Sequence, residues 1–300
     1  MPINYLGNGP YCYANALSMI FGDAGPGPAA LEILSGSAFG MTLRGEDLPY
    51  FSPAEWVPET GIPVILDLLG WTCDKQASTP EAAIAELREA SRTNPVLAGP
   101  VEMGLLPHHP NMGVAIGADH FLVVFGVEGD LVRAHDPQGF PFATIPVDAL
   151  LTAWNTESLV YDVPSYQIRK NFRQVREVPL ETALRASLPA AVKWLEGNSS
   201  RLAAERLAEV VEAGPNHIQH KYLTEFSVSC GARRLADAAV LLHDLGAIAA
   251  AKVLDEQANL VGALQHPLTV GENATAAALL RRLAPTYERL RDELLQETEG

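Results

Sequence analysis

Hydrophobic positions divide this chain into two regions with different patterns. Before residue 165 the apolar runs are short and are separated by Gly and Pro, which is typical of alternating strands and helices. After residue 178 apolar residues recur every three or four positions, the spacing of amphipathic helices. The pattern predicts an α+β domain over 1–165, a polar linker over 166–178 and an α-helical domain over 179–300.

The same periodicities place individual elements along the chain. In the first domain they predict helices at 12–21, 29–35, 62–69 and 81–92, and strands at 71–73, 95–101, 120–127, 131–136 and 158–161. Residues 41–60 contain several prolines and are expected to wind over the surface without regular structure. In the second domain the predicted helices are 180–197, 199–213, 218–244, 246–264 and 272–297, the last of them kinked at Pro285.

A cysteine stands at the start of the first predicted helix. Gly7, Gly9 and Pro10 favour a turn immediately before Cys12, and an apolar helical segment follows. A thiol at a helix N-terminus lies at the positive end of the helix dipole, which favours the reactive thiolate. Cys12 is therefore the candidate nucleophile, although a small buried cysteine is the alternative. Cys73 and Cys230 lack this context and are expected to be structural.

A nucleophilic cysteine needs a base and a group that orients the base. His120 opens a predicted strand, and Asp136 ends the next one, with Glu128, Gly129 and Asp130 between them as a hairpin loop. With a three-residue loop the two side chains are diagonal neighbours on one face of the hairpin, whereas a two-residue loop would put them on opposite faces. We predict a catalytic set of Cys12, His120 and Asp136. Asp119 and His135 point to the other face and are the runners-up.

Other polar residues have weaker claims to a role. The N–H group of Cys12 is the natural first oxyanion donor, and Asn8 is a candidate second donor, with Asn4 behind it. Glu102 follows a predicted strand and could hold an amine at the pocket mouth. His108 and His109 are expected at the pocket rim or the surface, because adjacent histidines do not easily chelate one ion; we expect no metal site.

Composition excludes several classes of protein. The formal net charge of −15 opposes nucleic-acid binding, and no apolar run reaches the length of a membrane span. Three dispersed cysteines argue against a disulfide framework and favour a reducing cytoplasm, and the start of the chain has no signal-peptide pattern. Arg169, Lys170, Arg173 and Arg176 form a basic patch on the predicted linker that could dock an acidic partner.

The order of Cys12, a distant His120 at the start of a strand and then Asp136-Pro137 resembles that of the papain-like cysteine enzymes, including the bacteriocin-leader peptidases of ABC transporters. The finer resemblance is to the BtrH N-terminal-domain family, and it covers most of residues 5–155. No Gln precedes Cys12, however, where papain-like peptidases place one. The matching stretches are Gly9-Pro10-Tyr11-Cys12 with its helix, the Phe39-Gly40 loop, Pro95-Val96-Leu97 leading to Leu106-Pro107-His108-His109, and Asp119-His120 through Asp136-Pro137.

The resemblance implies a papain-like fold and an acyltransferase of secondary metabolism, such as antibiotic biosynthesis. Such an enzyme moves an acyl group from a carrier-protein thioester through a Cys12 thioester to a small-molecule amine. It requires no cofactor, although the donor may arrive on a phosphopantetheine arm. A cysteine peptidase or amidase and a non-catalytic binding module are the alternatives. The helical region could serve as a lid, a carrier-docking platform or a homodimer surface.

Overall fold

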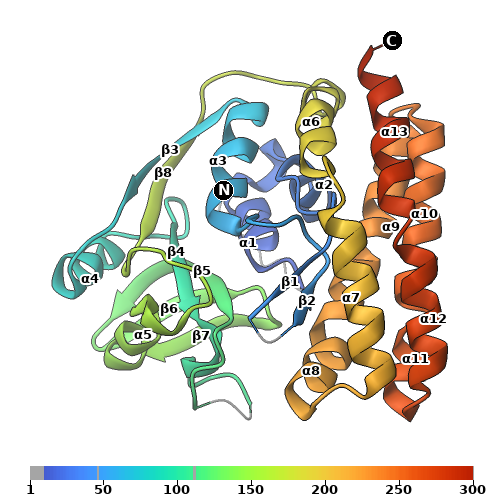
Figure 1. Ribbon diagram of the computed structural model, residues 1–300. Coiled ribbons are helices and arrows are strands. Elements are labelled where there is room, and N and C mark those ends of the chain that lie inside the picture. The colour runs from blue at the N-terminus through green and yellow to red at the C-terminus, as the bar shows by residue number, and fades with distance from the viewer. Residues whose placement is uncertain (1–9, 46, 111–112, 300) are drawn as a thin grey trace. The chain divides into compact units, whose positions relative to one another are not determined.

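The computed structural model describes residues 10–45, 47–110 and 113–299 and has a mixed α+β structure (Figure 1). The chain forms two compact units. Unit 1 combines Met1–Pro28 with Gly70–Glu177, and unit 2 combines Ala29–Leu69 with Val178–Gly300. This division differs from the contiguous domains expected from the sequence, because residues 29–69 pack with the C-terminal helices.

Unit 1 is built on an antiparallel sheet. Six strands of its described residues pair in the spatial order β3-β8-β4-β5-β6-β7 (Figure 1). They are β3 (Trp71–Gln76), β4 (Val96–Glu102), β5 (Asp119–Glu128), β6 (Leu131–Asp136), β7 (Phe140–Pro146) and β8 (Ile168–Gln174).

Two expectations for this region are wrong. Residues 166–178 are not a linker, because β8 lies between β3 and β4 inside the sheet. Residues 158–161 are not a strand, since Thr156–Ser158 forms a 3-10 turn followed by irregular chain. The first error has a physical cause: strand β8 is rich in charged residues, and it pairs with β3 and β4, which are distant in sequence.

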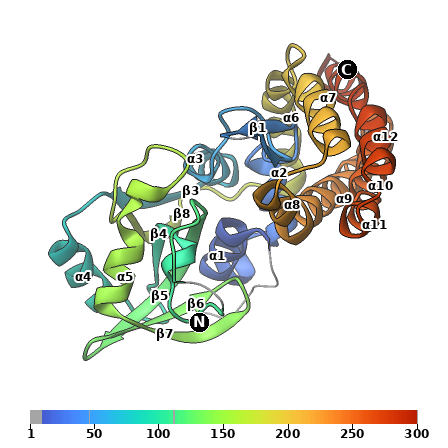
Figure 2. The same cartoon turned by 60° about the horizontal axis from the view of Figure 1, so that its bottom comes forward.

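Helices cover both sides of this sheet. They are α1 (Cys12–Phe21), α4 (Pro80–Arg88) and α5 (Val147–Trp154). α1 packs on β5, and α5 lies on the opposite side of the sheet (Figure 2). Alternation along β5 explains this arrangement: Leu122 and Val124 join the core beneath α4 and α5, whereas the ring of Phe121 meets that of Tyr13 on α1 at 6.5 Å.

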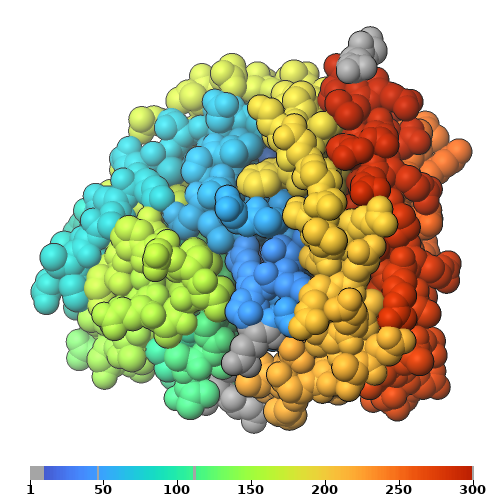
Figure 3. Space-filling view, in the orientation of Figure 1, coloured from blue at the N-terminus to red at the C-terminus, as the bar shows by residue number. Residues whose placement is uncertain are grey.

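Unit 2 consists of helices and a short hairpin. Its elements are α2 (Pro28–Leu34), β1 (Thr42–Arg44), β2 (Leu48–Tyr50), α3 (Pro58–Leu69), α6 (Leu180–Trp194), α7 (Ser199–Ala213), α8 (His217–Tyr222), α9 (Val228–Asp244), α10 (Ile248–Gly262), α11 (Gln265–Val270), α12 (Asn273–Leu283) and α13 (Thr286–Glu299). α7 packs on α12, and α13 packs on both α6 and α10. On the face drawn in Figure 3, the yellow and orange surface of the earlier helices meets the red surface of the last ones. The expected kink at Pro285 is confirmed as the break between α12 and α13.

Two details of unit 2 differ from the expected elements. Residues 41–60 contain the β1–β2 hairpin rather than only irregular chain. The expected helix 218–244 is divided by a π-helical segment, Leu223–Ser227, between α8 and α9. Among the described residues, no helix combines the length and apolar composition needed to cross a membrane.

A buried ion pair joins α2 to α9 inside unit 2. The Nε atom of Arg234 lies 2.7 Å from Oε2 of Glu32, whose side chain has no exposed surface. The same oxygen accepts a 2.6 Å hydrogen bond from the hydroxyl of Ser37. Glu32 therefore keeps its place in the core through one partner close in sequence, Ser37, and one that is distant, Arg234.

Replacing Arg234 by Ala should cost about 3–5 kcal/mol of unfolding free energy, because it leaves a buried carboxylate without its cation. Chemical denaturation measures the change. The matched control is Arg289→Ala, which removes an exposed pair with Glu256 at 3.0 Å and should cost no more than about 1 kcal/mol. Equal losses in the two variants would contradict this account of Glu32.

Candidate functional site

The hairpin of β5 and β6 brings His120 and Asp136 together, but not through the expected turn. The turn is Gly129-Asp130, since Glu128 pairs with Leu131, so it has two residues rather than three. The expected loop length is therefore wrong. With a two-residue turn and regular pairing between β5 and β6, the side chains of His120 and Asp136 would lie on opposite faces of the hairpin.

A β-bulge at Phe125 restores the pairing. Gly126 pairs with Arg133, whereas Val124 pairs with Ala134, so Phe125 is the extra residue. Continuing this register places Leu122 opposite Asp136, and His120 two positions away on the same face. Gly126 has a φ of 152°, a conformation that L side chains rarely adopt. A glycine inside a predicted strand was the sequence signal for this bulge.

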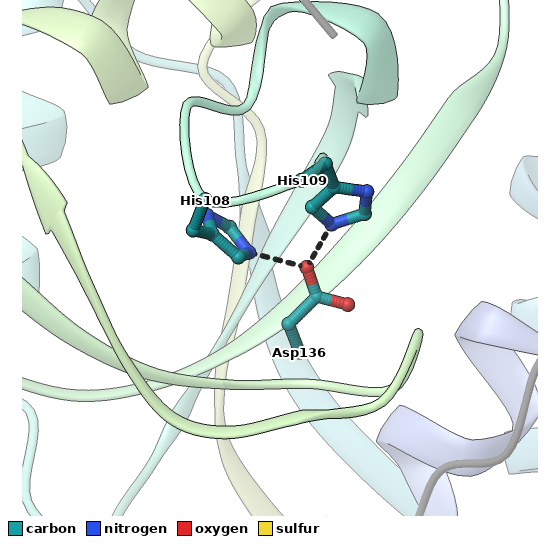
Figure 4. A group of neighbouring side chains, drawn as sticks. All are labelled: His108, His109 and Asp136. Atoms are coloured by element: carbon teal, nitrogen blue, oxygen red, sulfur yellow. Dashed lines mark hydrogen bonds and ion pairs between the residues drawn. The ribbon is translucent and has the colours of Figure 1, made fainter. Parts of the chain in front are cut away.

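The Asp136 carboxylate is the centre of the site. Nε2 of His120 lies 2.7 Å from Oδ1, and the N–H of Gln138 donates to the same oxygen at 2.7 Å. Nε2 of His108 and Nε2 of His109 lie 2.7 and 2.6 Å from Oδ2 (Figure 4). Asp136 is fully buried, and both of its oxygens are saturated by donors.

This environment keeps the carboxylate ionised. Burial by itself raises the pKa of Asp136, but the charge interaction with His120 and the hydrogen bonds from the three imidazoles outweigh it. Together they hold that pKa far below its usual range. An ionised carboxylate only accepts hydrogen bonds, so each of the three Nε2 atoms must carry the hydrogen. In neutral His120 this leaves Nδ1 with the lone pair, which is the form a base requires.

The placement of His108 and His109 corrects the sequence expectation. They lie on the loop between β4 and β5, and His109 is buried rather than at the surface, with only 6% of its area exposed. These two neighbouring side chains reach the same oxygen of Asp136, and their rings are steeply inclined to each other, at 77°. Phe140, at the start of β7, packs against both rings.

Cys12 is the first residue of α1 and is half-buried. The preceding residue, Tyr11, has a left-handed conformation with φ of 85°, which ends the turn and starts the helix. The contact of Tyr13 with Phe121 puts the first turn of α1 beside the start of β5. The pairing of Cys12 with His120 stays a prediction.

Glu102 has a different role from the expected one. Its carboxylate is fully buried and accepts hydrogen bonds from the backbone N–H groups of Gly104, Ile116 and Gly117 and from the hydroxyl of Ser158. These bonds hold both ends of the loop that carries His108 and His109. Glu102 therefore acts as a clamp on this loop, and its four bonds disfavour the predicted amine-binding role.

The remaining sequence candidates lie elsewhere. Asn8 and Asn4 fall outside the described residues. His135 is buried between the rings of Phe125 and Phe142, and burial followed by the nearby Arg92 lowers its pKa to about 4. The expected basic patch does not lie on a linker: Arg169 is buried within β8 and Lys170 forms an ion pair with Glu86, whereas Arg173 and Arg176 are exposed.

Fold and site together define an α+β protein with a buried histidine–aspartate cluster at one end of an antiparallel sheet. Residues 196–295 match the family model described as the YobF C-terminal domain. The chain is also similar to "Uncharacterized protein YobF" of Bacillus subtilis (strain 168), with 35% identity over 161 residues. This match spans about half of each protein, 52% of both this chain and the relative.

Glu102→Gln should destabilise unit 1 by about 1.5–3 kcal/mol, because an amide nitrogen would face donors that now bind a carboxylate oxygen. Hydrogen exchange of the Ile116 and Gly117 amides should accelerate at the same time. The matched control is Glu157→Gln, an exposed change close to Ser158 that should leave both measurements unaltered. Unchanged exchange in Glu102→Gln would disprove the clamp.

The three cysteines should differ in their reaction with iodoacetamide at neutral pH. Burial raises the pKa of Cys230 to about 11, and burial also raises that of Cys73, so little thiolate forms at either. Cys12 should therefore be alkylated first, and Cys230 only after unfolding. Peptide mapping by mass spectrometry follows the order, and native labelling of Cys230 ahead of Cys12 would contradict it.

Proposed function

We propose that this protein is a cysteine-dependent acyltransferase with a papain-like catalytic unit. It moves an acyl group from a thioester, delivered by an acyl carrier protein, to the amine of a small molecule and forms an amide. Cys12 is the nucleophile, His120 the general base and acid, and Asp136 the residue that orients His120. A reaction through a reduced thiol suits the cytoplasmic location that we also propose.

The reaction has two stages. His120 takes the thiol proton of Cys12, and the sulfur attacks the thioester carbonyl. The bond to the donor sulfur then breaks, and His120 gives this proton to the departing sulfur, which leaves as the donor thiol. The acceptor amine then attacks the Cys12 thioester carbonyl. The carbon–nitrogen bond forms as the bond to the Cys12 sulfur breaks, and His120 takes the amine proton and returns it to that sulfur. The products are an amide, the donor thiol and the regenerated enzyme.

The orientation of His120 carries this proposal. Its Nε2 atom donates to the buried Asp136 carboxylate at 2.7 Å, which leaves Nδ1 to accept a proton. A histidine held in this way is the usual partner of an activated cysteine. A buried carboxylate such as that of Asp136 costs desolvation energy, so a chemical role explains it better than a contribution to stability.

The location of α1 gives secondary support. Tyr13, next to Cys12, contacts Phe121, next to His120, so both candidates lie at the same end of β5. His120 and Phe121 alternate between the two faces of the strand. In the proposal, therefore, Cys12 meets the imidazole around the end of the sheet, just beyond Asp119 where β5 begins.

Intact-protein mass spectrometry tests the chemistry directly. Wild-type protein incubated with a panel of acyl thioesters should gain one acyl mass, which an added amine should remove faster than water does. Cys12→Ala should gain none. His120→Ala should acylate about 10²–10⁴-fold more slowly, the usual contribution of a general base.

Cys73→Ala is the matched control and should acylate like the wild type, since its thiol is half-buried and its pKa is raised. Removal of the acyl group by water alone would replace the transferase by a thioesterase or peptidase. A wild-type protein that no thioester acylates, with a Cys12 inert towards iodoacetamide, would instead favour the non-catalytic binding module.

A further inference from the structure

We infer that His108, His109 and Asp136 form a binding site for a divalent transition-metal ion, with Zn²⁺ as the representative. Their ligand atoms all lie within 4.8 Å of one another. Two imidazole nitrogens and one carboxylate oxygen are a donor set that suits Zn²⁺ and related first-row ions. The inference does not depend on the proposed acyl transfer.

The geometry of the three ligand atoms supports the site. Both Nε2 atoms already point at the same oxygen, Oδ2, from 2.7 and 2.6 Å (Figure 4). In a tetrahedral zinc site with bonds of about 2.0–2.2 Å, neighbouring ligand atoms lie about 3.3 Å apart. The carboxylate would therefore move back by roughly 0.6 Å, and the two Nε2 atoms, which lie within 4.8 Å of each other, would close to the same separation around an ion that replaces their hydrogens.

Charge and hydrogen bonding also favour an ion here. The buried Asp136 carboxylate supplies a negative charge at a place where a cation would otherwise be costly. Its other oxygen, Oδ1, keeps the bonds from His120 and Gln138, which orient the carboxylate as an outer shell does. The side chain of His108 is 14% exposed, which leaves a way in from solvent.

Binding would require each histidine to carry its hydrogen on Nδ1 instead of Nε2. For His108 this change breaks no hydrogen bond at Nδ1, which is buried and has no partner among the described residues. Three protein ligands leave a fourth position for water or another ligand, as in catalytic rather than structural zinc sites. This proposal replaces the sequence expectation of no metal site, which rested on the difficulty of chelating one ion with adjacent histidines.

Isothermal titration of the metal-free full chain with ZnCl₂ tests the site without reference to activity. One ion should bind per chain. His108→Gln and His109→Gln should each weaken binding by more than about 100-fold, because outer-shell partners alone are worth 10–100-fold. His243→Gln changes an exposed histidine of unit 2 and should have no effect.

A second measurement separates this site from binding at a thiol. Co²⁺ should give visible absorption bands without the charge-transfer band of a cobalt–thiolate bond, and the spectrum should be the same in Cys12→Ser. Because His108 is partly exposed, its variant should fold even if His109→Gln does not. Absence of saturable Zn²⁺ binding, its survival in folded His108→Gln, or its loss in Cys12→Ser would each overturn the inference, whatever the outcome of the acylation test.

Discussion

The site depends on one constraint: the Asp136 carboxylate is removed from water and must find all its hydrogen-bond donors within the protein. A buried carboxylate with missing partners is strongly unfavourable. Four donors meet this requirement, and they come from three places: the start of β5, the loop between β4 and β5, and the chain after β6. Satisfying Asp136 thus holds the histidine loop against the sheet and sets the orientation of His120.

A second buried carboxylate, that of Glu102, supports this arrangement at the two ends of the same loop. Glu102 ends β4 and binds the amides of Gly104, Ile116 and Gly117, so the loop is closed at its base by one anion and held at its middle by another. Burying either carboxylate costs hydration energy, which its hydrogen bonds offset. Their value lies in positioning, because each replaces solvent by a fixed set of donors.

The Asp136 carboxylate takes part in both proposals. Its Oδ1 atom faces His120, the residue of the proposed acyl transfer, and its Oδ2 atom faces His108 and His109, the residues of the proposed metal site. An ion on Oδ2 would withdraw negative charge from the group that orients His120. The two proposals are therefore physically linked, although each has its own test.

Local sequence determined much of unit 1 and of the site. Apolar periodicity located α1, α4, β4 and the β5–β6 hairpin, since each of these buries one face or both. The residue types alone singled out Cys12, His120 and Asp136. Only the tertiary structure decided the rest. The charged strand β8 is a strand because its partners supply the ladder, residues 29–69 join distant helices, and the bulge at Phe125 corrects the register that the two-residue turn would have reversed. The meeting of His108 and His109 on Asp136 likewise depends on contacts across more than 25 positions, which no local pattern records.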